Sequence, residues 1–443
     1  MGHGEQDLRR WQEVGVGQTL KPDNADRRES FRQNNVLRTA RPLPTPIMSS
    51  ITRPAALLLN VGHALDHLFM LIFATAITSI AADFGFERWE DLMPYGVGAF
   101  FLFGLGSLPS GRLGDLWGRR AMIVIFFIGL GSAALLAACA QNAWQLAGAL
   151  MLIGAFASIY HPVGIPMLVQ GSTKPGAVIG VNGLAGNLGV AAAALLTGFL
   201  IRESGWRAAF IVPGLVSIGC GIAFARLAPA ESAAPARRAK TASARLPAAA
   251  LARVFLVMTT AAVSGSMLFN FSTNGNERLL AERLQGIIND PARLGMLLAA
   301  VYAVASLAQV VVGRLIDRVP LKRLYLCVVG CQVPLLALAA HSTGWPLYIL
   351  LLATMIFIFG AIPFTDAMVV RYVDDDMRSR VAGMRLSVSF GISSLAVWLL
   401  GPVVKSGGFS TLLLIMAGIS LFTTTVVLFM PEEAAVRATV IQS

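Results

Sequence analysis

The chain has 443 residues, of which 56% are hydrophobic and only 13% are charged, and its mean hydropathy is +0.68. This composition is too apolar for a soluble globular protein and indicates a membrane protein. A formal net charge of +11 is compatible with nucleic-acid binding, but the basic residues are concentrated in loops expected on one side of a membrane. We therefore expect no nucleic-acid partner.

The N-terminal residues 1–53 are polar and basic, and they predict a disordered cytoplasmic tail. Twelve apolar stretches follow, each near the length of about 20 residues that crosses a bilayer. Backbone groups in lipid must be hydrogen-bonded within their own segment, so these stretches are predicted helices. The fold class predicted is an all-α membrane protein with twelve transmembrane helices, at residues 55–81, 92–110, 121–140, 144–168, 177–201, 207–227, 251–273, 293–312, 324–341, 346–370, 381–403 and 410–430.

Residues 228–250 combine alanines with three prolines and four basic residues, and they predict a flexible cytoplasmic linker. This linker separates an N-terminal half, 54–227, from a C-terminal half, 251–430, and residues 431–443 form a second tail. Most lysines and arginines fall in segments on one side, which predicts that both termini are cytoplasmic in the inner (plasma) membrane.

A charged turn, Gly111-Arg112-Leu113-Gly114-Asp115-Leu116-Trp117-Gly118-Arg119-Arg120, lies between two apolar stretches. A degenerate copy follows about 200 residues later, with Gly313, Leu315, Asp317, Lys322 and Arg323 in the corresponding places. The aspartate in each copy is expected to face helix-end amides or an arginine. The repeat predicts two related six-helix halves.

The first copy resembles the loop between the second and third helices of major facilitator superfamily transporters. The matching residues are Gly111, Leu113, Asp115, Gly118, Arg119 and Arg120. The resemblance implies that this loop latches the cytoplasmic helix ends in one access state. It also implies two parallel six-helix halves with the solute bound between them near the midplane.

Ionisable groups within a span cost about 2.5–3.5 kcal/mol each on insertion scales, so they indicate function. The first helix carries His63, Asp66 and His67 on one arc, which favours proton coupling or solute binding. Two alternatives remain: a hydrogen-bonded structural patch, and a divalent-metal site whose fourth ligand is not visible.

Other polar residues in spans are weaker candidates. His161 precedes Pro162, so it either acts in transport or bonds a carbonyl freed at a kink. Asp366 and Arg385 would form a buried ion pair that switches when a solute or proton competes, unless Arg385 extends to the surface. Asn182 lies among glycines, which favours close helix packing over solute contact.

The histidine–aspartate cluster of the first helix and Tyr160-His161-Pro162 are similar to the fosmidomycin-resistance branch of drug/proton antiporters, although Val163 stands where that branch carries an acidic residue. This resemblance implies proton-coupled drug efflux.

No nucleotide-binding loop or hydrolase motif is present, so we do not expect an enzyme. We predict a secondary active transporter that works by alternating access and exports a small organic solute or drug in exchange for protons. The alternative is proton-coupled uptake of a small metabolite such as an organic acid. A divalent-metal transporter and a non-transporting sensor are remote alternatives. We expect a monomer with no cofactor and no bound metal, driven by the proton gradient.

Overall fold

The computed structural model describes residues 51–170, 175–229, 248–372 and 375–431, and these residues contain helices and turns but no strand. The predicted all-α membrane fold is therefore confirmed. The predicted N-terminal tail, most of the linker at 228–250 and the C-terminal tail lie outside the described residues. The elements are α2 (Arg53–Asp83), α3 (Trp89–Leu92), the 3-10 helix η1 (Met93–Gly96), α4 (Val97–Trp117), α5 (Arg119–Ala138), α6 (Ala143–Ala157), the π-helix η2 (Tyr160–Gly164), α7 (Ile165–Val169), α8 (Pro175–Ser204), α9 (Trp206–Leu227), α10 (Ala248–Arg283), α11 (Pro291–Ile316), α12 (Leu321–Ala340), α13 (Gly344–Tyr372) and α14 (Asp375–Leu428).

Eleven helices in the described residues are long and apolar enough to cross a membrane. The last of them contains two crossings, because Gly408 has φ +72° and interrupts α14 with a conformation that glycine adopts readily. Beyond this break, Ser410 donates a hydrogen bond to the carbonyl of Ala340 at the end of α12. Further along, Ser420 donates to the side chain of Gln332, which lies earlier in the same helix α12. The chain therefore turns back along α12, which gives the twelve predicted crossings.

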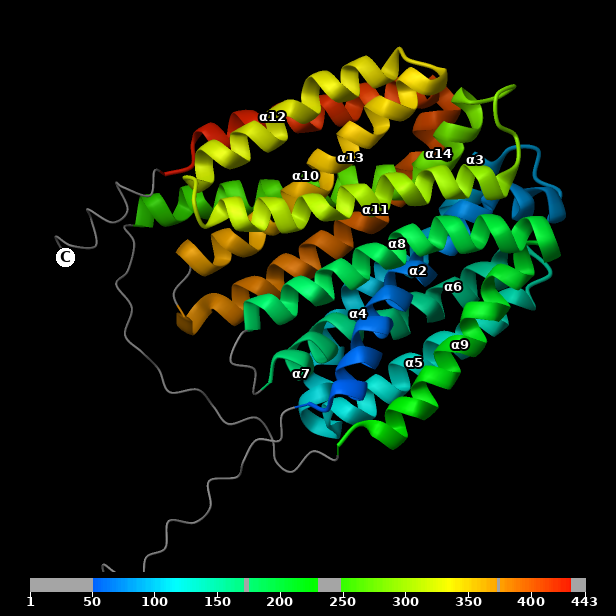
Figure 1. Ribbon diagram of the computed structural model, residues 1–443, viewed down its shortest axis with the longest axis horizontal. Helices are drawn as coiled ribbons and strands as arrows, with labels where there is room; N and C mark the ends of the chain where they lie inside the picture. Colours follow the sequence, from blue (N-terminus) through cyan, green and yellow to red (C-terminus); the bar gives the residue numbers. More distant parts are fainter. Residues whose placement is uncertain (1–50, 171–174, 230–247, 373–374, 432–443) are drawn as a thin grey trace, which may run out of the picture. The chain divides into compact units, whose positions relative to one another are not determined.

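The N-terminal helices α2–α9 and the C-terminal helices α10–α14 form two groups that meet along α8 and α11 and along α4 and α14 (Figure 1). Gly198, late in α8, lies against Pro291 and Gly295 at the start of α11, while Gly183 faces Gln309. These two helices are thus antiparallel. We name the end that holds Gly111–Arg120 and Gly313–Arg323 the motif end, and the opposite end the far end.

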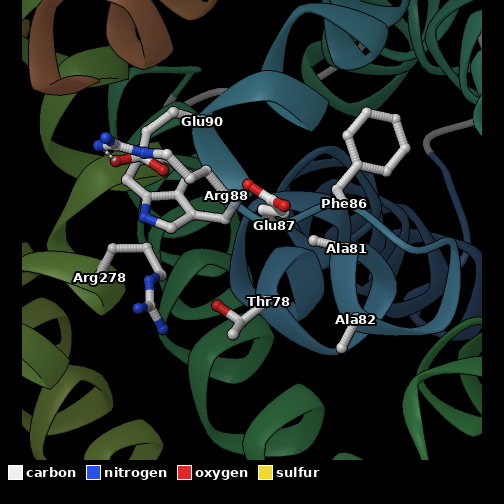
Figure 2. A pocket seen from close by; sticks show the side chains of 9 residues that line it. Thr78, Ala81, Ala82, Phe86, Glu87, Arg88, Glu90 and Arg278 are labelled. Carbon is white, nitrogen blue, oxygen red and sulfur yellow. Dashed lines mark hydrogen bonds and ion pairs between the residues drawn. The ribbon is translucent and has the colours of Figure 1, made fainter. Parts of the chain in front are cut away.

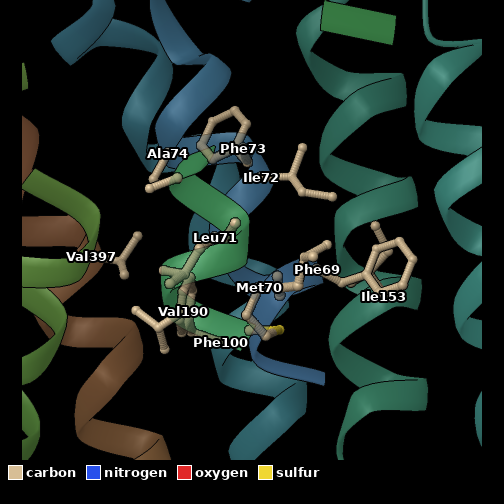
Figure 3. Packing of buried hydrophobic residues seen from close by; sticks show 14 of the residues in the cluster. Phe69, Met70, Leu71, Ile72, Phe73, Ala74, Phe100, Ile153, Val190 and Val397 are labelled. Atoms are coloured by element: carbon tan, nitrogen blue, oxygen red, sulfur yellow. The ribbon is translucent and has the colours of Figure 1, made fainter. Parts of the chain in front are cut away.

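The first long helix, α2, is buried on all sides in its middle. The seven consecutive residues from Leu68 to Ala74 are each 6% exposed or less, and consecutive residues point in every direction around a helix. Val397 of α14 joins the same apolar cluster (Figure 3). A helix that is apolar all round lies inside a bundle, so the polar residues of α2 are also directed into the bundle.

Close packing of α8 against α2 depends on glycine. A Cβ atom at Gly189 would overlap the carbonyl of Ala64, and one at Gly186 would press on the ring of His63. Small residues allow helix backbones to approach closely in membranes. The close packing predicted for the glycines around Asn182 is therefore found at Gly186 and Gly189 but not at Gly180 and Gly183. It brings Asn182 to His63 of α2.

The predicted end of the seventh span was wrong. The span was expected at 251–273, but α10 continues to Arg283, and Asn274 and Asn276 are less than 5% exposed within it. Asn274 donates to the carbonyl of Asn270 (3.0 Å), and Asn276 donates to the hydroxyl of Tyr302 (3.3 Å). Hydropathy alone does not distinguish a polar loop from a polar helical segment that is hydrogen-bonded inside the bundle.

Candidate functional site

Three histidines and one aspartate converge between α2 and η2. His63 and His67 of α2 have ring centroids 5.0 Å apart, and His161 of η2 lies 5.0 Å from His63 and 5.8 Å from His67. The Nε2 atom of His161 is 3.5 Å from an oxygen of Asp66. The structure thus brings His161 to the cluster predicted on the first helix.

A hydrogen-bond network fixes one side of this cluster. The backbone carbonyl of Asn182 accepts from Nδ1 of His63 at 2.7 Å. The side-chain amide of Asn182 donates to the Tyr160 hydroxyl at 2.7 Å and to Asn60 at 3.0 Å. Tyr160 in turn donates to the carbonyl of Leu59 at 2.7 Å. Because a carbonyl only accepts, Nδ1 of His63 carries the proton, and Nε2 of the neutral ring is an acceptor.

The π-turn explains how the fourth span supplies two of these residues. Tyr160–Gly164 form a π-helix that contains Pro162, which lacks a backbone N–H group and disturbs the regular helix. Turns of this kind occur frequently at functional sites. Here the turn directs both Tyr160 and His161 toward α2, with Tyr160 stacked on His63 at 4.9 Å.

Asp66 is fully buried, at 0% exposure, and neither carboxylate oxygen accepts a hydrogen bond from the described residues. The His161 ring lies 3.5 Å from one of these oxygens. An ionised carboxylate without hydrogen bonds is costly in a low-dielectric interior. Asp66 therefore requires either a proton or a donor that is not part of this chain's described residues.

The three imidazoles are also the described group that could hold a metal ion. Their ligand nitrogens lie within 4.8 Å of one another, whereas tetrahedral zinc with Zn–N bonds of about 2.0–2.1 Å needs nitrogens about 3.3 Å apart. The rings would have to move closer to bind a metal. Our expectation of no bound metal stays a prediction.

The predicted ion pair between Asp366 and Arg385 is present in the C-terminal half, but it is not buried as predicted, because the Asp366 side chain is exposed. The two side chains are 2.6 Å apart, with 13% of Arg385 and 65% of Asp366 exposed. Arg385 also donates to the hydroxyl of Thr365.

The charged turns lie at helix ends, as the repeat predicted. Gly118 separates α4 from α5 with φ +89°, a conformation that favours glycine. Arg119 bonds Gln170 at 3.3 Å, and Arg120 bonds the carbonyls of Ala225 and Ala228. These contacts tie α5 to η2–α7 and to α9 at the motif end.

The two aspartates of the turns show no such anchoring. Asp115, near the end of α4, and Asp317, the residue after α11, are exposed, and neither has a hydrogen bond or ion pair within the described residues. Gly111 packs near Pro162, while Gly313 and Arg323 flank the second turn. The latch role of these residues stays a prediction.

Sequence reasoning missed a polar face on α10. Asn270 donates to Ser393 at 2.8 Å, while buried oxygens of Asn274 and Glu277 accept no hydrogen bond from the described residues. The signal was visible as a run of Ser, Thr, Asn and Glu between residues 264 and 277. It was overlooked because its second half was assigned to a loop.

At the far end, several contacts join the two halves. Lys405 of α14 bonds Asp91 of α3 at 2.5 Å, Arg202 of α8 lies 4.0 Å from Asp290, and the guanidinium of Arg278 lies 5.9 Å from the centre of the Trp89 ring. These contacts are at the surface and individually weak. Together they indicate that the halves are closed against each other at the far end.

A pocket of about 330 Å³ lies beside these contacts, between the end of α2, α3 and α10. Figure 2 shows Arg278 facing Thr78 across it, with the Arg88–Glu90 ion pair (2.7 Å) at its rim. The neighbouring carboxylate of Glu90 raises the pKa of Arg88 further above its usual range. Of the charges that border the pocket, Arg88 and Glu90 are paired with each other.

Comparisons with known proteins match this architecture. The family model of the Major Facilitator Superfamily matches residues 59–285 and 279–442. Solved structures share the fold: a D-xylose–proton symporter has a TM-score of 0.67 at 12% identity, covering 86% of this chain and 98% of that one. A bacterial homologue of the human lysosomal transporter Spinster, in an inward-facing and occupied conformation, has a TM-score of 0.65 at 14% identity, covering 85% and 93%.

Relatives by sequence match only parts of the chain. A probable actinorhodin transporter of Streptomyces coelicolor is 29% identical over 42% of this chain and 33% of its own length. A probable hexose phosphate transport protein of Chlamydia pneumoniae is 27% identical over 37% of this chain and 36% of its own. The puromycin resistance protein pur8 of Streptomyces alboniger is 30% identical over 30% of this chain and 27% of its own. The matches span about a third of each of these relatives.

Transporters of this kind lie in lipid bilayers and bind small solutes, and they are not enzymes. Because the family model covers most of its length and the solved transporters share its fold, the chain belongs to the Major Facilitator Superfamily.

Proposed function

We propose that the protein is a secondary active transporter that exports a small organic solute or drug in exchange for protons. The observation that carries this proposal is Asp66: a fully buried carboxylate at the centre of the bundle without a hydrogen-bond donor among the described residues. A proton supplies the missing hydrogen-bond donor in one access state. Release of this proton drives the transporter back to the other access state. Such coupling requires only that the proton affinity of the site differs between the two states.

Around Asp66, His63 and His67 tune the site from the same helix. His161 adds a third imidazole from η2, 3.5 Å from the carboxylate.

Export is favoured over uptake by the names of two relatives, which refer to actinorhodin and to puromycin resistance. The third name, hexose phosphate transport, supports the alternative, proton-coupled uptake of a small metabolite.

In either case Asp115 and Asp317 would latch the motif end when it closes. We propose that this end and both termini face the cytoplasm, that the membrane is the inner (plasma) membrane, that the transporter is a monomer, and that it uses the proton gradient without a cofactor.

Purified protein in liposomes tests the proposal. A pH gradient of either sign is imposed, and movement of puromycin and of glucose 6-phosphate is followed together with the internal pH. We expect puromycin to move against its own gradient, opposite in direction to the proton. Movement of glucose 6-phosphate in the same direction as the proton would establish the uptake alternative, and movement that ignores the pH gradient would refute proton coupling.

A further inference from the structure

The charges at the centre of the bundle are unequally balanced. Arg385 is already paired with Asp366 at 2.6 Å and bonded to Thr365, so its positive charge is neutralised within the C-terminal half. Asp66 lies among imidazoles, with the His161 ring at 3.5 Å, and histidine is mostly neutral at neutral pH. The charge left without a strong partner is therefore negative.

The unsatisfied atoms beside this charge are acceptors. Both oxygens of Asp66 and the Nε2 atom of His63 are buried without a hydrogen bond from the described residues. Nδ1 of His63 is committed to the carbonyl of Asn182 at 2.7 Å, which leaves Nε2 as an acceptor in the neutral ring. A ligand group that fits these atoms must donate several hydrogen bonds.

The surrounding surface is aromatic. Tyr160 is stacked on His63 at 4.9 Å, and Phe103 meets the edge of His161 at 5.9 Å; Tyr160 is 0% exposed and Phe103 5%. Aromatic faces attract cations through their ring quadrupoles, and more strongly where water is excluded. They offer nothing comparable to an anion.

We propose that the cluster of Asp66, His63, Tyr160 and Phe103 binds the protonated amine of an organic cation, with Asp66 as the counter-ion. This rests on the proposed transport function and names its substrate class. The ammonium donates to Asp66 and to Nε2 of His63, and its substituent lies against the two aromatic rings. Solute and proton then use the same carboxylate in turn, so exchange follows without a second binding site.

The test uses four probes on one scaffold: phenylbutylamine, its trimethylammonium derivative, phenylbutanol and phenylbutyrate. Their binding to the purified full-length protein in nanodiscs is measured by the rise in melting temperature with probe concentration. We expect the amine to bind at least about tenfold more tightly than the alcohol or the carboxylate, the ratio given by one charge-assisted hydrogen bond. The trimethylammonium probe, a cation without N–H donors, should bind with intermediate affinity.

Variants connect this preference to the site. Asp66→Asn should remove the preference for the amine, and Asp66→Glu should retain it. Asp83→Asn is the matched control, because Asp83 ends the same helix and pairs with Arg207 at the far end; it should leave all four affinities unchanged. If Asp66→Asn does not fold, protection of wild-type Asp66 from a carbodiimide by the amine and not by phenylbutyrate gives the same answer.

Equal affinities for the amine, alcohol and carboxylate, tighter binding of the carboxylate, or an amine preference that survives Asp66→Asn would overturn the proposal. Binding is measured without a gradient, so the result is separate from proton coupling. If the protein preferred the amine but its transport did not depend on the pH gradient, the proton-coupled mechanism would be refuted. The proposed binding site would still be supported.

Discussion

Replacing Tyr160 by phenylalanine removes one hydroxyl from the network that holds the histidine cluster. This hydroxyl donates to the carbonyl of Leu59 and accepts from Asn182, each at 2.7 Å. Interhelical hydrogen bonds in membrane proteins contribute about 0.6 kcal/mol on average and up to about 1.7 kcal/mol. Two such bonds give a loss of roughly 1–3 kcal/mol in the free energy of unfolding.

The structure favours the lower half of that range. Asn182 keeps its second acceptor, Asn60, at 3.0 Å, and the carbonyl of Leu59 lies within α2, where it also accepts the helical hydrogen bond. Neither partner is therefore left wholly unsatisfied. We expect Tyr160→Phe to lower the free energy of unfolding by about 1–2 kcal/mol, while the stacking on His63 persists.

The assay is equilibrium unfolding of the purified protein in mixed micelles, followed by tryptophan fluorescence. Tyr325→Phe is the matched control: Tyr325 is 2% exposed, and its hydroxyl has no hydrogen bond within the described residues. Its loss should change stability little. If Tyr160→Phe were as stable as Tyr325→Phe, the network would not hold the site together as described.

Three further predictions concern other parts of the molecule. Asp115→Asn should insert normally and lower the transport rate by at least about tenfold, the size of a lost charge-assisted contact, and Asp317→Asn should have a milder effect; wild-type rates for Asp115→Asn in liposomes would contradict the latch. A reporter inserted at 232–245 should be cytoplasmic and one at Gly286, in the turn after α10, external, and the reverse result would overturn the proposed orientation. Gly189→Leu should destabilise the protein by about 3 kcal/mol or more, because its side chain would overlap the carbonyl of Ala64; a melting temperature equal to wild type would exclude the close α2–α8 contact.

The fold was predictable because lipid leaves the backbone few choices. Twelve apolar stretches of membrane length must be helices, and the repeated turns at Asp115 and Asp317 reveal the duplication. Helix ends were less predictable. The stretch after residue 273 is polar enough for a loop, yet Asn274 and Asn276 are hydrogen-bonded inside α10.

The candidate site was predictable only within one helix. His63, Asp66 and His67 share an arc of α2 because of helical periodicity alone. The approach of His161 depends on the π-turn and on how the fourth span packs, and neither follows from residue spacing. The hydrogen bond between His63 and the backbone carbonyl of Asn182 was also not predictable. Every residue has a backbone carbonyl, so the residue type does not indicate which one accepts.

The central claim is that Asp66 carries the proton that drives transport. The direct measurement compares Asp66→Asn with wild type in the same liposomes, first for accumulation driven by a pH gradient and then for solute exchange at equal pH. Asparagine keeps the shape of the side chain and cannot take up the proton. We predict that accumulation is lost while exchange persists at higher solute concentration, because a neutral side chain at position 66 binds an amine solute more weakly. His63→Gln and His67→Gln should shift the pH optimum and still accumulate solute. Gradient-driven accumulation by Asp66→Asn at the wild-type level would contradict the account and direct attention to Asp366 and His161.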